Sequence, residues 1–322
     1  MMDINRIKTV LKDHYHTGHV DVIPQQGGWA ALAYKVFDDT HTYFLKVYEK
    51  SRTSTSKWTA LIDHYLPVTI WLLQNSSLKD KIPVPILTKH GEYKCESEDA
   101  IYLLYQYING ETIGNRDLSE EQVCRLAEIM AELHSFGEEI PVKTEALMED
   151  FSVPFLQQLR STLDKDQCND TMTTDVAEII EPYAERIKYL MDTVEQLSAR
   201  LKNGSLRMAL CHTDIHNWNL MQSEGRLILI DWEGLKIAPV EADLMFLVDN
   251  PHYDAFLSTY LKFHKNYMIN DDALKFYQVR RKLEDVWEFI EQLLFDKQDE
   301  QEKAETKNLL IKELKEINIY IS

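Results

Sequence analysis

The residues best suited to chemistry lie in one short stretch, CHTDIHNWNLMQSEGRLILIDWE, at positions 211–233. Asp214 and Asn219 are five positions apart, His212 precedes the aspartate by two, and Asp231 follows the asparagine by twelve. Phosphoryl transfer requires a carboxylate that accepts a hydroxyl proton and an oxygen-rich site that holds Mg²⁺ on the phosphates. An acid, an amide and a second acid meet that requirement, so the stretch predicts phosphoryl transfer to a hydroxyl group.

The two halves of this stretch are joined by a predicted β-hairpin. Residues 218–222 and 226–230 alternate in polarity around a turn at 223–225, a pattern typical of paired strands. The hairpin is expected to bring Asn219 and Asp231 beside each other. Either half alone would be weak evidence for a catalytic site, because short motifs of this kind arise by chance. Both halves together, at kinase spacing, favour a catalytic site.

Strand-forming runs dominate the first hundred residues. Residues 32–37 and 43–48 are rich in β-branched and aromatic side chains and flank a turn-like Asp-Asp-Thr, which predicts a hairpin. Residues 101–108, IYLLYQYI, form a third apolar strand. Between them, a helix is expected over about 57–74.

Helical patterns dominate the remainder of the chain. Ser119 followed three residues later by Gln122 is typical of a capping box. Residues 151–202 have a helical pattern that Pro182 bends or breaks. Apolar residues at helical spacing across 283–294 predict another long helix.

The expected fold is therefore α+β with two lobes, a small β-rich lobe over 1–106 and a larger helical lobe over 107–322. Within 209–248, HTDIHNWN followed by LILIDWEGLKIAPVEADLMFL resembles the catalytic and metal loops of the aminoglycoside phosphotransferase and choline kinase superfamily. The resemblance is greatest to the spectinomycin-type aminoglycoside phosphotransferases. It implies a protein kinase-like fold.

The resemblance also implies a role for each acidic residue of this segment. Asp214 becomes the catalytic base, and Asn219 and Asp231 become the metal ligands. Asp243 becomes the buried acid that braces the catalytic loop. ATP, with GTP as the alternative, and Mg²⁺ are the implied cofactors.

Two neighbouring residues receive less direct roles. By the same resemblance, His212 has a structural role within the catalytic loop. Glu233, two positions after Asp231, is either an additional carboxylate near the metal or a surface residue.

Lys46 is the expected nucleotide lysine. It lies within the apolar strand YFLKVY, where a buried ammonium requires a negative partner, and the resemblance places it on the ATP phosphates. Family members pair this lysine with a glutamate on the following helix, but residues 51–74 contain none. Asp63 is the acid available there and Glu49 is nearer in sequence, so the partner remains open.

The other expected nucleotide contacts have weaker signals in the sequence. Gly27 and Gly28, in the segment QGGW before the first hairpin strand, allow backbone to approach a phosphate, although a Gly-Gly pair is more often only a turn. The segment LYQYING at the lobe junction resembles the hinge that binds adenine. By that resemblance the Gln106 carbonyl and the Ile108 amide are the expected contacts.

Acceptor recognition is assigned to the helical lobe. Glu284, Glu288 and Glu291 recur at i, i+4 and i+7, so they share one stripe of a helix. The stripe is either a contact surface for a cationic substrate or a solvated charged face. Trp287 and Tyr277 are expected in the core rather than as a substrate platform.

The overall charge limits the partners. Fifty-three acidic against thirty-five basic residues give a formal net charge of −18, which disfavours nucleic acid and anionic membranes. A cationic small substrate suits such a field, and a solubilising acidic surface explains it as well.

The cysteine pattern and the N-terminal sequence indicate the cellular compartment of the protein. Cys95, Cys124, Cys168 and Cys211 are scattered without a CxxC pair, so neither a zinc site nor a disulfide framework is expected. The start lacks the pattern of a signal peptide, and no apolar run of about 18 residues predicts a membrane helix. We expect a cytoplasmic protein.

The resulting hypothesis is a small-molecule kinase. An aminoglycoside or aminocyclitol is the first-choice acceptor, which would connect the chain to antibiotic resistance, and choline-, homoserine- or methylthioribose-like alcohols remain open. A non-catalytic pseudokinase is the alternative from another class, disfavoured because Lys46, Asp214, Asn219 and Asp231 are all present. A protein kinase is disfavoured because no activation segment ending in Ala-Pro-Glu follows Asp231.

Overall fold

The computed structural model describes residues 2–27, 30–163 and 174–317. The chain separates into two compact units, and each is described by itself. The first comprises Met1–Met148 and Met208–Tyr267, and the second comprises Glu149–Arg207 and Met268–Ser322. The first unit thus contains both the N-terminal strands and the predicted catalytic segment, and the lobe boundary at 106/107 stays a prediction.

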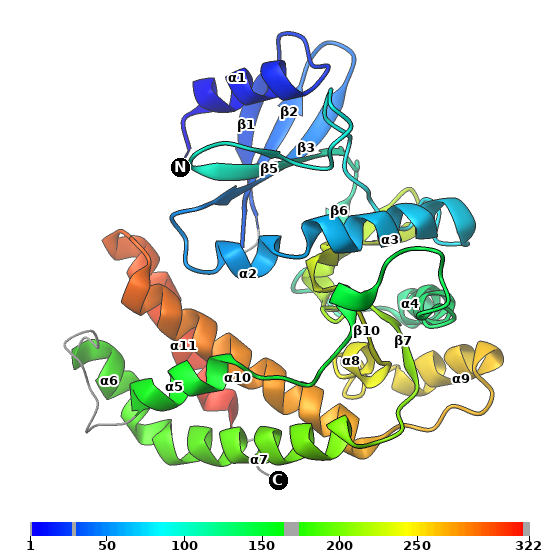
Figure 1. Cartoon of the computed structure of the whole chain (residues 1–322), viewed down its shortest axis with the longest axis vertical. Coiled ribbons are helices and arrows are strands. Elements are labelled where there is room, and N and C mark those ends of the chain that lie inside the picture. Colours follow the sequence, from blue (N-terminus) through cyan, green and yellow to red (C-terminus); the bar gives the residue numbers. More distant parts are fainter. Residues whose placement is uncertain (1, 28–29, 164–173, 318–322) are drawn as a thin grey trace. The chain divides into compact units, whose positions relative to one another are not determined.

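An antiparallel five-stranded sheet forms the N-terminal part of the first unit (Figure 1). Its strands are β1 (Asp21–Gln25), β2 (Leu32–Phe37), β3 (Thr42–Glu49), β5 (Ala100–Gln106) and β4 (Cys95–Glu96), in that spatial order. The β2–β3 pair confirms the predicted hairpin. Helix α1 (Ile4–His14) contributes Ile7 and Leu11 to a core shared with Tyr34, Leu45 and Tyr102. Burying side chains of this size stabilises the sheet by about 1.5–3 kcal/mol each.

The single helix expected over 57–74 is divided into two. Helix α2 spans Thr55–Thr59 and α3 spans Ile62–Asn75. Leu61 separates them because its backbone leaves the helical region, with φ −104° and ψ 8°.

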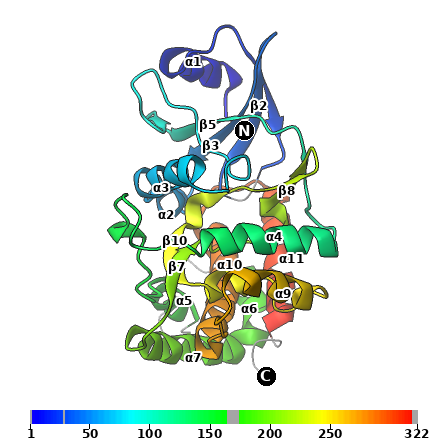
Figure 2. The same cartoon turned by 90° about the vertical axis from the view of Figure 1, so that its right-hand side faces the viewer.

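The rest of the first unit includes the predicted catalytic segment. It contains α4 (Glu120–Leu133), the three-stranded sheet β6 (Glu111–Thr112), β8 (Leu220–Ser223) and β9 (Arg226–Leu229), and the pair β7 (Met208–Cys211) with β10 (Lys236–Pro239). Short helix α8 (Glu241–Leu244) follows β10, and α9 (Tyr253–Phe263) packs against α4 (Figure 2). The capping box is confirmed, because Ser119 and Gln122 exchange hydrogen bonds at the start of α4.

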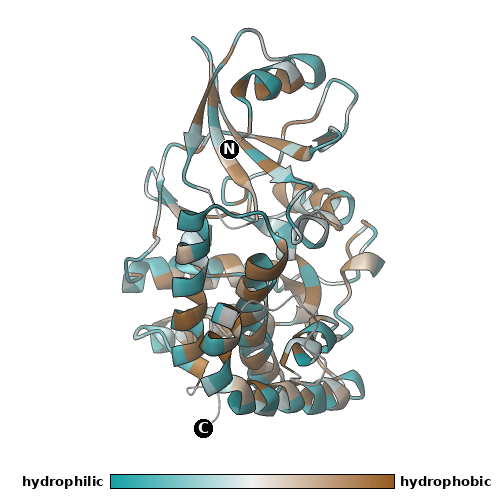
Figure 3. Cartoon of the chain, turned by 90° about the vertical axis from the view of Figure 1, so that its left-hand side faces the viewer, coloured by the Kyte–Doolittle hydropathy of each residue, from teal (hydrophilic) through white to brown (hydrophobic). Residues whose placement is uncertain are grey.

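The second unit is helical. It contains α5 (Phe155–Leu163), α6 (Thr174–Ile180), α7 (Ala184–Lys202), α10 (Asp271–Phe295) and α11 (Glu300–Glu316), and α10 packs against α7 and α11. Pro182 lies in a short 3₁₀ turn between α6 and α7, so the predicted break is confirmed. Figure 3 shows hydrophobic and hydrophilic residues on different sides of the long helices, as expected where one face of each is buried. None of the helices in these described ranges has the length and apolar character needed to traverse a bilayer.

Candidate active site

Asp214 and Asn219 face each other across the loop that follows β7. The Asn219 amide nitrogen donates to both the backbone oxygen and the Oδ2 of Asp214, each at 2.9 Å. Asn219 is buried, whereas the Asp214 side chain keeps 21% of its surface exposed. The asparagine therefore orients a carboxylate that a substrate can still reach.

The predicted hairpin brings Asp231 back toward Asn219. Strands β8 and β9 pair with Leu220 opposite Leu229, and the Ile230 amide donates to the Asn219 carbonyl at 2.9 Å. The first strand begins later than predicted. Trp218 and Asn219 lie in a 3₁₀ turn because the His216 ring caps it, accepting from the Trp218 amide at 3.2 Å.

Asp231 has a backbone conformation that is rare for residues other than glycine. Its φ of 65° and ψ of 68° place it in the left-handed region, which costs roughly 1–2 kcal/mol and which aspartate and asparagine tolerate best. Its carboxylate, 35% exposed, lies 3.0 Å from the Lys46 ammonium. The turn thus directs this acid toward the strand that carries the lysine.

Lys46 is paired with two acids of residues 230–234, which follow β9 and are called the metal segment below. Its Nζ lies 2.5 Å from Glu233 Oε1, and Tyr48 donates to the same oxygen. Burial alone would lower the pKa of Lys46, but the carboxylates of Asp231 and Glu233 outweigh it and raise the pKa well above its ordinary value. Burial favours the neutral form of Glu233, and Lys46 overcomes this and lowers its pKa. Both groups are therefore charged at neutral pH.

This pairing corrects two expectations. Asp63 does not pair with Lys46, because its exposed carboxylate binds Lys94 at 2.5 Å, and Glu49 binds Arg52 instead. Glu233 is not a surface residue, since only 8% of its side chain is exposed.

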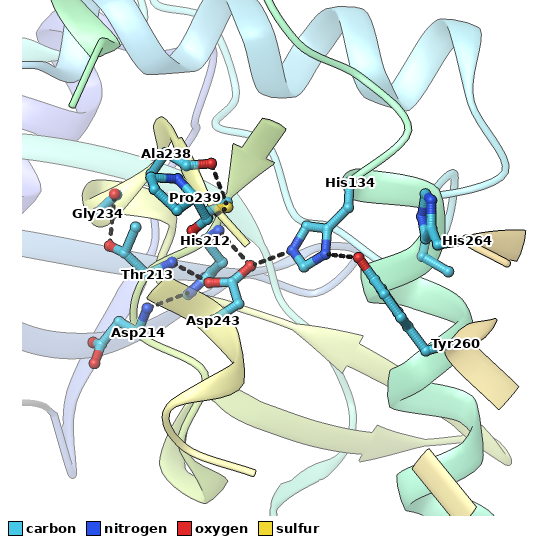
Figure 4. Close-up of polar contacts among 12 residues, drawn as sticks. His134, His212, Thr213, Asp214, Gly234, Ala238, Pro239, Asp243, Tyr260 and His264 are labelled. Carbon is cyan, nitrogen blue, oxygen red and sulfur yellow. Dashed lines mark hydrogen bonds and ion pairs between the residues drawn. The ribbon is translucent and has the colours of Figure 1, made fainter. Parts of the chain in front are cut away.

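The Asp243 side chain braces the catalytic loop by binding backbone amides of the loop (Figure 4). Its side chain is fully buried on α8, where Oδ2 accepts from the His212 amide at 3.0 Å and Oδ1 accepts from the Thr213 amide at 2.5 Å. His134, at the end of α4, contacts Oδ2 through Nε2 at 2.9 Å, and its Nδ1 lies 2.8 Å from the Tyr260 hydroxyl of α9. Two helices thereby support the residue that positions the loop.

His212 connects the catalytic loop to the metal segment. Its Nε2 lies 2.9 Å from the Ile230 carbonyl, and its Nδ1 accepts from the Asp214 amide at 3.3 Å. These partners require a neutral ring protonated at Nε2. Burial lowers the pKa of His212, which favours the same neutral form, although nearby acids such as Asp243 oppose the shift. His212 therefore has a structural position.

A close approach between Gly234 and Thr213 joins the same two segments. The Thr213 hydroxyl donates to the Gly234 carbonyl at 2.7 Å. A Cβ at position 234 would lie 2.6 Å from that hydroxyl oxygen and 2.9 Å from the His212 carbonyl. Glycine is the residue that this approach permits.

Asn219 and Asp231 carry atoms suited to Mg²⁺. Because the Asn219 nitrogen is directed at Asp214, the amide oxygen is the atom left to bind a cation. Carboxylate and amide oxygens are the hard donors that Mg²⁺ prefers. The donor set therefore fits the implied metal.

The expected glycine and hinge contacts stay predictions. At Gly27, a Cβ would come within 2.9 Å of the Ala31 carbonyl, so close backbone packing requires glycine there. Gly28 and Cys168 lie outside the described residues. Gln106 ends β5, with its side chain donating to a backbone carbonyl of β3, and Ile108 follows the strand.

The substrate candidates belong to α10 of the second unit, whereas the catalytic segment belongs to the first. Glu284, Glu288 and Glu291 are half-buried on this helix. Arg280 binds Glu284 at 3.2 Å and Glu149 at 3.1 Å, so part of the negative charge is neutralised. The role of the stripe in acceptor binding stays a prediction.

Sequence reasoning missed His134, Tyr260, Tyr48 and His216. The His216 Nε2 lies 3.4 Å from Asp214 Oδ1. Two of these residues carried a local signal, since His216 is two positions from Asp214 and Tyr48 is two positions from Lys46 on the same strand.

His134, Cys211 and Asp243 are a buried group of metal-ligand types. Their atoms already have hydrogen-bond partners, including the Ala238 carbonyl at 3.5 Å from Cys211 Sγ. These bonds make the group a structural support.

Known proteins share this architecture. A family model described as the phosphotransferase enzyme family matches residues 21–277. Protein StrN of Streptomyces griseus is 24% identical over 185 residues, which cover 53% of this chain and 56% of that protein. The chain thus matches only about half the length of this relative.

Two solved structures are similar over nearly all of both chains. Spectinomycin phosphotransferase in complex with ADP and spectinomycin has a TM-score of 0.75 and 21% identity, covering 98% of this chain and 99% of that one. Amicoumacin kinase in complex with AMP-PNP, Ca²⁺ and Ami has a TM-score of 0.60 and 16% identity, covering 99% and 94%. These likenesses confirm the predicted α+β, kinase-like fold.

Proposed function

We propose, because this chain belongs to the phosphotransferase enzyme family, that it transfers the γ-phosphate of ATP to a hydroxyl of a small molecule. One observation carries the proposal. The Asp214 carboxylate, still accessible, is oriented by the amide of Asn219 at 2.9 Å, and the hairpin returns Asp231 to the same end of the sheet. This arrangement supports a base and two cation ligands drawn from one segment.

Each residue has a chemical role in this mechanism. Asp214 accepts the proton of the attacking hydroxyl, and Asn219 orients the Asp214 carboxylate through its amide nitrogen. Lys46 binds the phosphates. Asn219 and Asp231 would hold Mg²⁺, which when bound neutralises the charge that develops on the phosphates. Asp243 and His212 position the loop without touching substrate.

The acceptor we propose is an amino-bearing small molecule, first an aminoglycoside or aminocyclitol. The −18 charge supports a cationic acceptor, because an acidic field raises the encounter rate of cations. Similarity to a structure that contains spectinomycin points to the same class. A role in antibiotic resistance and a cytoplasmic location follow from this proposal.

An acceptor panel tests the proposal. Purified protein would be incubated with ATP, Mg²⁺ and, separately, spectinomycin, several aminoglycosides, choline, homoserine and methylthioribose, with phosphorylated product measured by mass spectrometry. We expect phosphorylation of an aminoglycoside or aminocyclitol, absent in Asp214→Asn. Phosphorylation of choline alone would reject the acceptor class but retain the phosphotransferase. ATP binding without phosphorylation of any compound would favour a binding module.

A further inference from the structure

Lys46 lacks the helical partner that protein kinases give to the corresponding lysine. In protein kinases that lysine pairs with a glutamate on a helix of the same lobe. Residues 51–74, which contain α2 and α3, have no glutamate. Their acid, Asp63, has a side chain 62% exposed and bound to Lys94. The role of the helical acid must therefore be filled from elsewhere.

We infer that Glu233, from the metal segment, is the positioning residue that holds Lys46 for the nucleotide. The inference rests on the proposed function. Glu233 is only 8% exposed and its Oε1 lies 2.5 Å from Lys46 Nζ. A buried charge pair of this kind persists when additional hydrogen bonds satisfy it. Tyr48 supplies one by donating to the same oxygen from the same strand as Lys46.

The two acids bound to Lys46 differ in exposure, and we assign them different roles for that reason. Asp231 keeps 35% of its side-chain surface exposed, and its oxygens suit a cation. Glu233 is bound by Tyr48 and Lys46, so it would keep its contact with the lysine if Asp231 held a metal. The lysine is thus coupled to the metal segment rather than to α3.

Neutralising Glu233 tests the inference. Glu233→Gln should weaken ATP binding about 10-fold, measured by calorimetry without acceptor, since a hydrogen bond to a charged group contributes about that factor. Tyr48→Phe should weaken it by a few-fold. Asp63→Asn, the matched control, should bind ATP within about two-fold of wild type. Circular dichroism would establish that each variant is folded.

A double-mutant cycle shows whether Glu233 acts through the lysine. In a Lys46→Met background, Glu233→Gln should cause no further loss of ATP affinity, because the group it positions is gone. If Glu233 instead serves as a metal ligand, Glu233→Gln will still reduce ATP affinity in the Lys46→Met background. That reduction will disappear when Mg²⁺ is omitted, and this result overturns the inference. Wild-type affinity in Glu233→Gln, or a 10-fold loss in Asp63→Asn, also overturns it.

The same measurements separate this inference from the proposed function. If the wild-type protein binds no ATP, both fail together. If it binds ATP and phosphorylates an acceptor while Glu233→Gln behaves as wild type, only the inference fails.

Discussion

At the scale of single residues, we propose that the amide of Asn219 performs two tasks. Its nitrogen orients Asp214 at 2.9 Å, and this leaves its oxygen for a cation. Because both proposed tasks depend on one side chain, replacing Asn219 would disturb the proposed base and the proposed metal site together. Substitutions of Asp214 and Asp231 should therefore change activity while leaving the fold intact.

Asp214→Asn should retain fold and nucleotide affinity while turnover falls about 10²–10⁴-fold, the usual loss for a general base. The amide has nearly the same shape but does not accept the hydroxyl proton. Turnover with the best acceptor and ATP affinity by calorimetry measure the two properties separately. A variant that loses only ATP binding would remove Asp214 from the catalytic role.

Asp231→Asn should abolish productive use of Mg²⁺ and nucleotide, because the amide lacks the charge that anchors the metal. Asparagine tolerates the left-handed backbone at this position, so the fold should survive. Titration with nucleotide, with and without Mg²⁺, measures the effect. Lys46→Met is the comparison, since it should weaken nucleotide handling in both conditions, and wild-type turnover in Asp231→Asn refutes the metal assignment.

At the scale of elements, three helices converge behind the catalytic loop. Helix α8 supplies Asp243, α4 ends at His134, and α9 supplies Tyr260 (Figure 4). The contacts form a chain from the Tyr260 hydroxyl through the imidazole to the carboxylate that binds the loop. Removing the Tyr260 hydroxyl from this series of contacts should therefore disturb the position of Asp214.

Tyr260→Phe should reduce turnover several-fold and stability by about 1 kcal/mol, because His134 loses the hydrogen bond that fixes its ring. Tyr267→Phe is the matched control, since that hydroxyl donates to Glu241 rather than to His134. We expect the control to change stability but not turnover. Equal turnover in both variants and wild type, measured with nucleotide and acceptor saturating, would mean that the hydroxyl serves packing alone.

The elements also show which features a sequence can predict. The β2–β3 hairpin, the capping box at Ser119 and the break at Pro182 were predictable because each depends on residues a few positions apart. The partner of Lys46 was not, because Glu233 lies 187 positions away and the pair forms only through tertiary packing. The contact between His134 and Asp243, 109 positions apart, was missed for the same reason, although the resemblance had already assigned Asp243 to the support of the loop.

At the scale of the whole molecule, charge is the dominant property. The second unit contains a half-buried acid, Asp285, that is unfavourable when ionised. Burial raises the pKa of Asp285 to about 6, from an ordinary value of 3.8, even though Arg281 lies 2.9 Å away and opposes the shift. A folded-state pKa above the unfolded one means that the native state binds the proton more tightly. This stabilising contribution is present below about pH 4 and is lost as the pH rises to about 6.

Asp285→Asn should therefore stabilise the protein at pH 7.5 and have little effect near pH 4. The gain should be about 1–2 kcal/mol, less than the full shift implies because the side chain is 28% exposed and binds Arg281. Urea unfolding at both pH values measures it. Asp175→Asn is the control of opposite sign, because a hydrogen bond from Lys307 lowers the pKa of that acid. Destabilisation by Asp285→Asn at pH 7.5 would contradict the prediction.

The −18 charge also predicts how the acceptor binds. If acidic groups attract a cationic acceptor, salt should raise the acceptor KM, because ions screen exposed charges over about 10 Å at 0.1 M. ATP must be saturating, since salt would also weaken the proposed contact between ATP and Lys46. Glu288→Gln and Glu291→Gln should raise the acceptor KM more than they lower kcat if these acids bind ground and transition states alike. Glu284→Gln should have a smaller effect, because Arg280 already neutralises part of that charge. An acceptor KM indifferent to salt would mean that the acidic balance only solubilises the surface, and the cationic acceptor would lose its physical support.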